Sequence, residues 1–207
     1  LGEGELKDSI NKFAEKVNFP ISRIDVMDGS LRSSKANAYF SGLGKNKRIA
    51  LFDTLIENHR IDELLSIIAH EVGHYKRRHN IKGIIMGVIQ SGIMFFMLSL
   101  FINNLELFSA FRMENLSIYA SLLFFSLLYS PIDLFMSFIS NKISRNHEFE
   151  ADMFAHDSIG TGKHLVEGLK KLTVNNLGNL TPHPLTVWLS YSHPPVIDRI
   201  NALEKDE

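Results

Sequence analysis

Two long apolar segments constrain the fold of this 207-residue chain more than any other feature of its sequence. Residues 83–102 contain no charged side chain, and residues 116–139 contain only one, Asp133. Because an α-helix rises about 1.5 Å per residue, the first segment can span about 30 Å, the thickness of a bilayer core. Two buried core helices are the alternative, but a soluble domain of this length could hardly cover so much apolar surface. With the short linker at 103–115, the pattern predicts a transmembrane hairpin.

Charged residues beside the two segments predict which way the hairpin faces. Lys and Arg next to transmembrane helices favour the cytosolic side, and here they gather at the outer ends of the hairpin. We therefore expect an integral membrane protein whose residues outside the hairpin face the cytosol, in the endoplasmic reticulum of a eukaryote or the inner membrane of a bacterium. Inside the second segment, Pro131 predicts a kink, and Asp133 needs a partner or a hydrated cavity. The flanking basic residues are Lys76, Arg77, Arg78, Lys82, Lys142 and Arg145.

A five-residue motif just before the first apolar segment indicates the chemistry. It reads His70-Glu71-Val72-Gly73-His74, and residues 61–69 before it have the amphipathic pattern and acidic first turn of a helix. Histidines four residues apart lie on one helix face, so both imidazoles can bind the same metal ion. Glu71 between them can then take a proton from water that the metal activates. A surface helix that carries two histidines by chance is the alternative.

A catalytic zinc ion needs a third protein ligand. One known arrangement places a histidine six residues after the second, but Asn80 occupies that position. His79 is one residue out of place, in the basic stretch that follows the motif, and we expect it at the protein surface. The third ligand must therefore come from elsewhere in the chain.

A later helical segment, residues 144–155, offers a carboxylate ligand. Glu148 and Asp152 are four residues apart and share a helix face. Glu148 can bind the metal while Asp152 accepts a hydrogen bond from the far nitrogen of a metal-bound histidine. His147 is a less favoured ligand, and Glu150 points away from the pair and is expected in solvent. A solvent-facing acidic stripe is the alternative reading of Glu148 and Asp152.

The rest of the sequence predicts helices around a small sheet. We expect the fold class to be α+β: a mainly helical, zincin-like metalloprotease domain with a small β-sheet and a two-helix transmembrane hairpin. Residues 1–207 would form a single catalytic domain, with the transmembrane helices inserted within it. Trp188 is expected in the core. The expected elements are helices at 6–19, 164–177 and 194–203, a strand at 24–28, and a β-hairpin of 36–40 and 48–52 around a turn at 42–46.

Taken together, these segments resemble the type I CAAX prenyl endopeptidases, a family of integral-membrane zinc metalloproteases. The resemblance runs over residues 4–203 with matched spacing, so it is more specific than any one motif. It implies that Zn²⁺ is bound by His70, His74 and Glu148. Glu71 would be the general base, and Asp152 would orient a zinc-bound histidine. The matching segments are residues 28–40, 47–55, 70–74, 144–152 and 192–200.

The resemblance also implies how a peptide or protein substrate is held. Asn37, Ala38 and Tyr39 would form an edge strand that pairs with the substrate backbone, as an added strand does on a sheet edge. His193 would contact the scissile carbonyl or its oxyanion, and Arg199 would support the site. Family members begin with additional transmembrane helices, so we expect such N-terminal helices, as well as the lipid bilayer, to be partners of this region.

The predicted function is peptide-bond hydrolysis by a membrane zinc metalloendopeptidase, with CAAX-type C-terminal processing of prenylated proteins as the activity. One alternative is a membrane-protein quality-control protease of the heat-shock type. Another is a catalytically silent zinc-binding membrane scaffold, against which the intact Glu71 argues. A net charge of −1 gives no reason to expect a nucleic acid partner. The absence of cysteine excludes a thiol nucleophile and cysteine zinc ligands.

Overall fold

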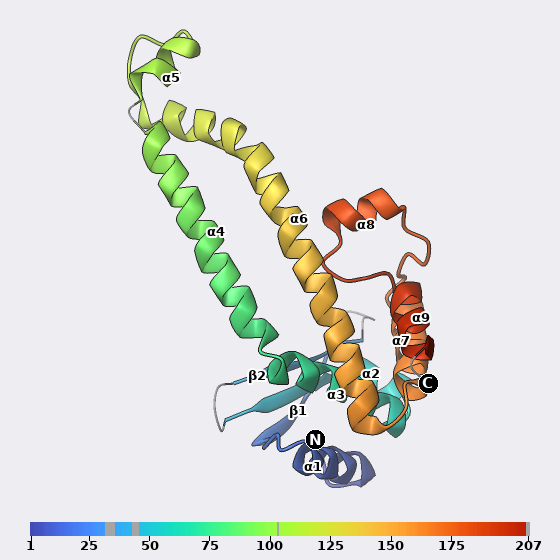
Figure 1. The fold of residues 1–207 in the computed structure, drawn as a ribbon. Coiled ribbons are helices and arrows are strands. Elements are labelled where there is room, and N and C mark those ends of the chain that lie inside the picture. The colour runs from blue at the N-terminus through green and yellow to red at the C-terminus, as the bar shows by residue number, and fades with distance from the viewer. Residues whose placement is uncertain (32–35, 43–45, 103, 206–207) are drawn as a thin grey trace.

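The computed structural model describes residues 1–31, 36–42, 46–102 and 104–205, and it combines a helical body, a small sheet and a long helical hairpin (Figure 1). This arrangement confirms the predicted α+β class. The elements are α1 (Glu5–Lys16), β1 (Arg23–Met27), β2 (Ala38–Ser41), β3 (Arg48–Phe52), α2 (Asp53–Asn58), α3 (Ile61–Lys76), α4 (His79–Phe101), α5 (Leu105–Ala110), α6 (Ile118–Ile159), α7 (Lys163–Asn175), α8 (Pro184–Ser190) and α9 (Val196–Lys205).

The sheet has the strand order β1-β3-β2. Its central strand β3 carries Ile49 and Leu51, which are completely buried, and this burial explains why the strand is so apolar. β1 pairs with β3 in parallel, and β2 pairs with β3 antiparallel, with Ala38 opposite Leu51. The predicted pairing of two strands into a hairpin is therefore confirmed, whereas residues 43–45 of its turn lie outside the described residues. The order leaves β2 at an edge of the described sheet.

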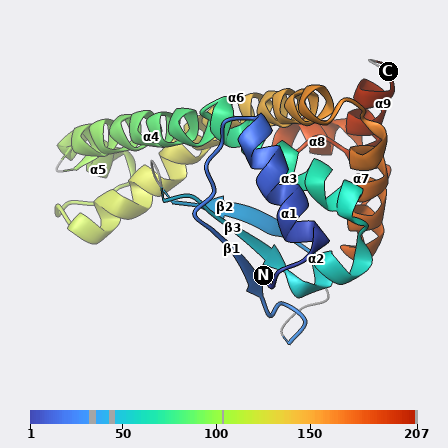
Figure 2. The same cartoon turned by 90° about the horizontal axis from the view of Figure 1, so that it is seen from below.

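Helix α3 occupies the centre of the body, where it packs against α1, β2, α6 and α7. Figure 2 shows α1 and α3 next to the sheet. Ile68, Ala69 and Val72 are fully buried in this position. Burying one such branched aliphatic side chain contributes about 1.5–3 kcal/mol, so the packing holds α3 firmly. The motif at residues 70–74 thus stands on a rigid element.

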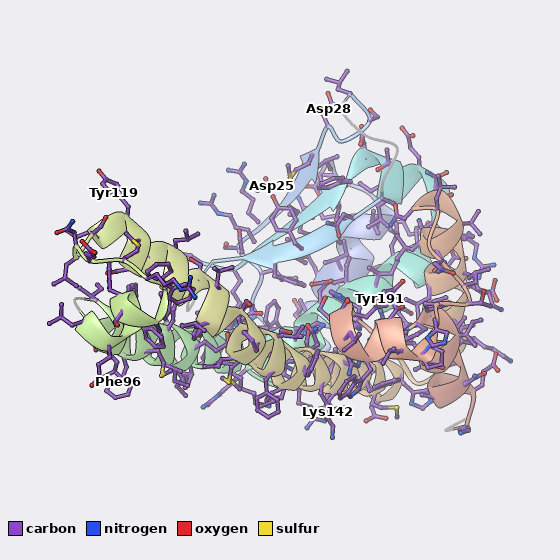
Figure 3. All side chains as sticks on the ribbon, turned by 90° about the horizontal axis from the view of Figure 1, so that it is seen from above. Asp25, Asp28, Phe96, Tyr119, Lys142 and Tyr191 are labelled. Carbon is purple, nitrogen blue, oxygen red and sulfur yellow. The ribbon has the colours of Figure 1, made fainter. Side chains whose placement is uncertain are left out.

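Helices α4 and α6 leave the body together and are joined at their far end by α5, which the sequence did not predict (Figure 1). Both are long and apolar enough to cross a membrane. Phe96 and Tyr119 are 63% and 87% exposed, and their side chains project outward from the hairpin (Figure 3). α6 is one continuous helix of 42 residues, so the second apolar segment runs directly into residues 144–155. Pro131 lies inside α6, which curves in its N-terminal part (Figure 1).

Trp188 does not lie in the core, so that expectation is wrong. Its helix, α8, packs along α6 rather than inside the body. The indole is 51% exposed and stacks on Phe138 of α6 with ring centroids 4.6 Å apart. Asn141 and Arg145 of α6 donate hydrogen bonds to carbonyl groups of the α8 region. A tryptophan on a short helix that flanks a longer one keeps one face in solvent, and the local sequence does not reveal this.

Candidate metal centre

The two histidines of the motif face one another across one turn of α3. Their Nε2 atoms are 3.1 Å apart. His70 is buried and His74 is half-buried. Burial lowers the pKa of His70 and outweighs the opposing effect of its hydrogen bond to Asp152. A neutral imidazole keeps a lone pair on Nε2, which is the form that binds a metal ion.

Glu148 of α6 completes a group of three possible metal ligands with these histidines. One carboxylate oxygen lies 3.3 Å from Nε2 of His74 and the other lies 3.5 Å from Nε2 of His70. One ligand atom from each residue can be chosen so that all lie within 4.8 Å of one another. Ligands at about 2.0–2.1 Å from a tetrahedral ion lie about 3.3 Å from each other, so the donor atoms fit such an ion.

Glycine in the motif is what allows α3 and α6 to approach so closely. A Cβ atom added at Gly73 would lie 3.1 Å from the Cα and the carbonyl oxygen of Ala151. Ala151 lies between Glu148 and Asp152 in the sequence of α6 and is itself completely buried. The small residues at this crossing therefore bring the histidines of α3 to the carboxylate of α6. Gly73 was not among the predicted site residues, although a glycine in a helix interior is a signal of close packing.

Asp152 contacts the Nδ1 side of the His70 ring, and Arg199 bridges Asp152 and Glu148. Nδ1 of His70 is 2.8 Å from Oδ1 of Asp152, so its N–H donates to that carboxylate and its Nε2 faces the metal position. Arg199 of α9 donates two hydrogen bonds to Asp152, at 2.6 and 2.7 Å, and Nη1 lies 3.2 Å from Glu148. The structure thus brings together both residues that the sequence placed around the ligands.

The two glutamates of the site have opposite pKa shifts. Burial raises the pKa of Glu71 to about 7, which suits a group that takes and returns a proton near neutral pH. Glu148 lies outside the apolar segment 116–139, and burial by itself would raise its pKa too. Its contacts with the His74 and His70 rings and the charge of Arg199 outweigh that burial and lower the pKa of Glu148 to about 2. Glu148 is therefore ionised and ready to bind a cation.

A cavity of about 450 Å³ opens in front of these residues. Glu71 and Glu148 line it, and so do Asn37, Ala38 and Tyr39 of the edge strand region. His193 lines it as well, with its side chain 66% exposed and Nε2 3.4 Å from Glu148. Ser192 lies 2.9 Å from the other ring nitrogen of His193. All the residues that were predicted from the sequence to contact the substrate therefore line the same cavity.

His79 contradicts the expectation of a surface position. Only 5% of it is exposed, and its Nδ1 lies 3.0 Å from Nδ1 of His74. The expectation rested on the basic residues before His79, which give no sign of the break that follows α3. This helix ends at Lys76, Arg78 takes the left-handed conformation with φ of 59°, and α4 begins at His79. The break turns His79 back toward the motif.

Comparison with known proteins agrees with this geometry. The model of peptidase family M48 matches residues 1–207. The chain belongs to this family. The CAAX prenyl protease 1 of Saccharomyces cerevisiae is 34% identical over 99% of this chain and 48% of its own length. The Arabidopsis thaliana homolog is 38% identical over 100% of this chain and 49% of its own length. The crystal structure of S. mikatae Ste24p matches with a TM-score of 0.88 and 34% identity, over 99% of this chain and 51% of that one.

This M48 chain spans about half the length of the curated relatives it matches. The human CAAX prenyl protease 1 homolog, for example, is 34% identical over 99% of this chain and 51% of its own length. The resemblance to CAAX prenyl proteases that the sequence motifs indicated is confirmed. The roles of the individual site residues stay predictions.

Proposed function

We propose that this region is the catalytic part of a membrane zinc metalloendopeptidase. The observation that carries the proposal is the convergence of His70, His74 and Glu148, with Glu71 beside them. Two imidazoles and one carboxylate are a ligand set that catalytic zinc uses, and they leave a coordination position open. When bound, zinc supplies Lewis-acid activation of water and of the scissile carbonyl.

The protein's own residues would transfer the proton, contact the oxyanion and orient His70. The Glu71 carboxylate accepts a proton from the attacking water and returns it to the leaving nitrogen, so a peptide bond and water give a carboxylate and an amine. His193 donates a hydrogen bond to the developing oxyanion from its exposed ring. Asp152 and Arg199 keep His70 in the tautomer that presents Nε2.

The edge strand offers a way to bind the substrate in an extended form. β2 has β3 on one side only among the described strands, and residues 37–39 line the same cavity as Glu71. A peptide added along this edge would run past the metal position. Because the relatives are CAAX prenyl proteases, we propose that the substrates are C-terminal segments of prenylated proteins.

The hairpin supports a membrane location for the same reaction. We propose that residues 1–207 form one catalytic unit in which 83–102 and 116–139 cross the bilayer. The exposed apolar faces of α4 and α6 would contact lipid or further transmembrane helices of a longer protein. The basic residues at the body end of the hairpin favour a cytosolic catalytic face.

Hydrolysis of paired peptides tests the proposal. The protein in detergent micelles would receive a farnesylated CAAX peptide and the same peptide without the lipid. Glu71→Gln should keep its zinc but lose about 10²–10⁴ in rate, because the amide cannot act as a base. Glu167→Gln, an exposed change on α7, is the matched control.

The outcomes distinguish a CAAX-type protease, a quality-control protease and a zinc-binding scaffold. Cleavage of the farnesylated peptide that Glu71→Gln abolishes supports the proposal. Equal or faster cleavage of the lipid-free peptide would indicate the quality-control type of protease instead. Zinc binding without hydrolysis of either peptide would indicate a scaffold, and equal rates for Glu71→Gln and the parent protein would exclude this mechanism.

A further inference from the structure

The far side of the His74 ring has a partner of its own. Nε2 of His74 faces Glu148 and the metal position, whereas Nδ1 lies 3.0 Å from Nδ1 of His79. Beyond this contact, Nε2 of His79 lies 3.0 Å from Oε2 of Glu150. The chain of contacts therefore runs from the metal position through two imidazoles to a carboxylate.

When both imidazoles are neutral, only one placement of protons satisfies every link of this chain. Glu150 as a carboxylate is an acceptor, so Nε2 of His79 must carry a hydrogen. Nδ1 of His79 then has a free lone pair and accepts the Nδ1–H of His74. Nε2 of His74 is left without a hydrogen, and its lone pair points at the metal position. The opposite tautomer of His79 would set the lone pair of its Nε2 against the Glu150 carboxylate, which cannot donate a hydrogen bond.

We propose that His79 is a positioning residue for the metal ligand His74. Glu150 in turn fixes the tautomer of His79. The inference rests on the metal site proposed above. It gives His74 the same kind of support that Asp152 gives His70, with an imidazole inserted between ligand and carboxylate. Partners of this kind orient a ligand and make it more basic, and their loss typically costs about 10–100-fold in metal affinity.

The surroundings hold His79 in place for this task. Its ring stacks on His147 of α6, with centroids 4.0 Å apart and planes 8° from parallel. The ring is buried although the residues before it are exposed. The left-handed turn at Arg78 aims it at α3, a conformation that costs a non-glycine residue about 1–2 kcal/mol. Stacking, burial and a strained turn that all serve one contact indicate more than a surface histidine.

Zinc affinity of matched variants tests the inference. Competition with a chelator would measure the zinc dissociation constant, and the visible absorption of the Co²⁺-loaded protein would report the ligand geometry. His79→Leu should weaken zinc binding about 10–100-fold and shift the Co²⁺ spectrum. His79→Asn should recover most of the affinity, because its amide places a polar atom where Nδ1 lies. Glu167→Ala, far from the site on α7, should match the parent protein.

Glu150 provides a second route that does not depend on a buried substitution. Its side chain is 45% exposed, so Glu150→Ala should fold normally. We expect a loss of affinity of about tenfold, and no further loss when it is combined with His79→Leu, since Glu150 acts through His79. The melting temperature of each metal-free variant separates a loss of ligand positioning from a loss of packing.

The possible results are distinguishable from failure of the metal site itself. A parent protein that binds no zinc would overturn the proposed function. Tight zinc binding by the parent protein together with unchanged affinity in His79→Leu and Glu150→Ala would overturn only the positioning role. Equal losses in His79→Asn and His79→Leu that track the metal-free melting temperature would do the same, because they indicate packing alone.

Discussion

Replacing Gly73 with alanine adds a single methyl group and should disrupt the proposed metal site. Gly73 lies where α3 crosses α6, between the two histidines in sequence. A new Cβ would lie 3.1 Å from two backbone atoms of Ala151 and 3.2 Å from Cβ of Phe154. None of these atoms is the end of a flexible side chain, so none can swing aside. The two helices must separate instead.

The size of the effect follows from these distances. Ordinary contact begins at 3.4 Å, so relief of a 3.1 Å contact requires at least 0.3 Å of movement (3.4 − 3.1). Metal–ligand distances tolerate only about 0.2 Å. α3 supplies His70 and His74 while α6 supplies Glu148, so the movement acts directly on the proposed ligand set. We expect a tenfold or greater loss of zinc affinity, which corresponds to about 1.4 kcal/mol.

Folding stability should fall by no more than about 2 kcal/mol, because two effects of the substitution oppose each other. Alanine in place of a helical glycine gains about 1 kcal/mol of helix propensity. Overpacking costs about 1–3 kcal/mol, so the net loss is between about zero and 2 kcal/mol. Chelator competition and thermal unfolding in detergent would measure the two quantities. In the control Gly92→Ala, a Cβ meets no atom within 4 Å, so zinc affinity should not change. A folded Gly73→Ala protein with zinc affinity within twofold of the parent would refute the reasoning.

Three further predictions address the ligand, the core and the membrane. Glu148→Ala should lose most of its zinc on dialysis, and metal analysis that finds full occupancy in the folded variant would exclude Glu148 as a ligand. Lys171→Met should destabilise the protein by about 1–3 kcal/mol in thermal unfolding at neutral pH, because it removes the 2.6 Å ion pair of the buried Glu63 carboxylate. Although burial opposes it, the Lys171 hydrogen bond lowers the pKa of Glu63, so this difference should disappear as the pH falls through that pKa. In intact cells, an impermeant thiol reagent should label Ser109→Cys and not Lys163→Cys, and the reverse pattern would contradict a cytosolic catalytic face.

Local spacing predicted most of the candidate site because its residues come in pairs within single helices. His70 and His74 share α3, and Glu148 and Asp152 share α6, so a period of 3.6 residues is enough to place each pair on one face. Two short strand-like segments around a glycine-containing turn predicted the β-hairpin in the same way. What these patterns could not state is that the two helices cross at Gly73 and Ala151, since that contact joins residues far apart in sequence.

The wrong expectations have a common physical origin. His79 was placed on the surface because it follows a basic stretch of sequence. The left-handed conformation of Arg78 between two helices turns His79 toward His74, and basic residues give no signal of such a turn. Trp188 was placed in the core on its apolar character alone, yet its helix α8 packs against α6, outside the body. Both errors treat burial as a local property when tertiary contacts decide it.

The continuity of α6 links the metal site to the apolar segment before it. Residues 139 and 148 are separated by nine helical steps, so Glu148 lies about 14 Å beyond the end of that segment along one rigid helix. On the other side, His79 begins α4 and also contacts His74. A displacement of α6 relative to α4 would therefore move Glu148, a proposed ligand, relative to His79, which contacts the proposed ligand His74. The packing between these two helices is thus part of what sets the ligand distances, and changes near the Gln90–Ser140 hydrogen bond that joins them should alter metal affinity without touching the site.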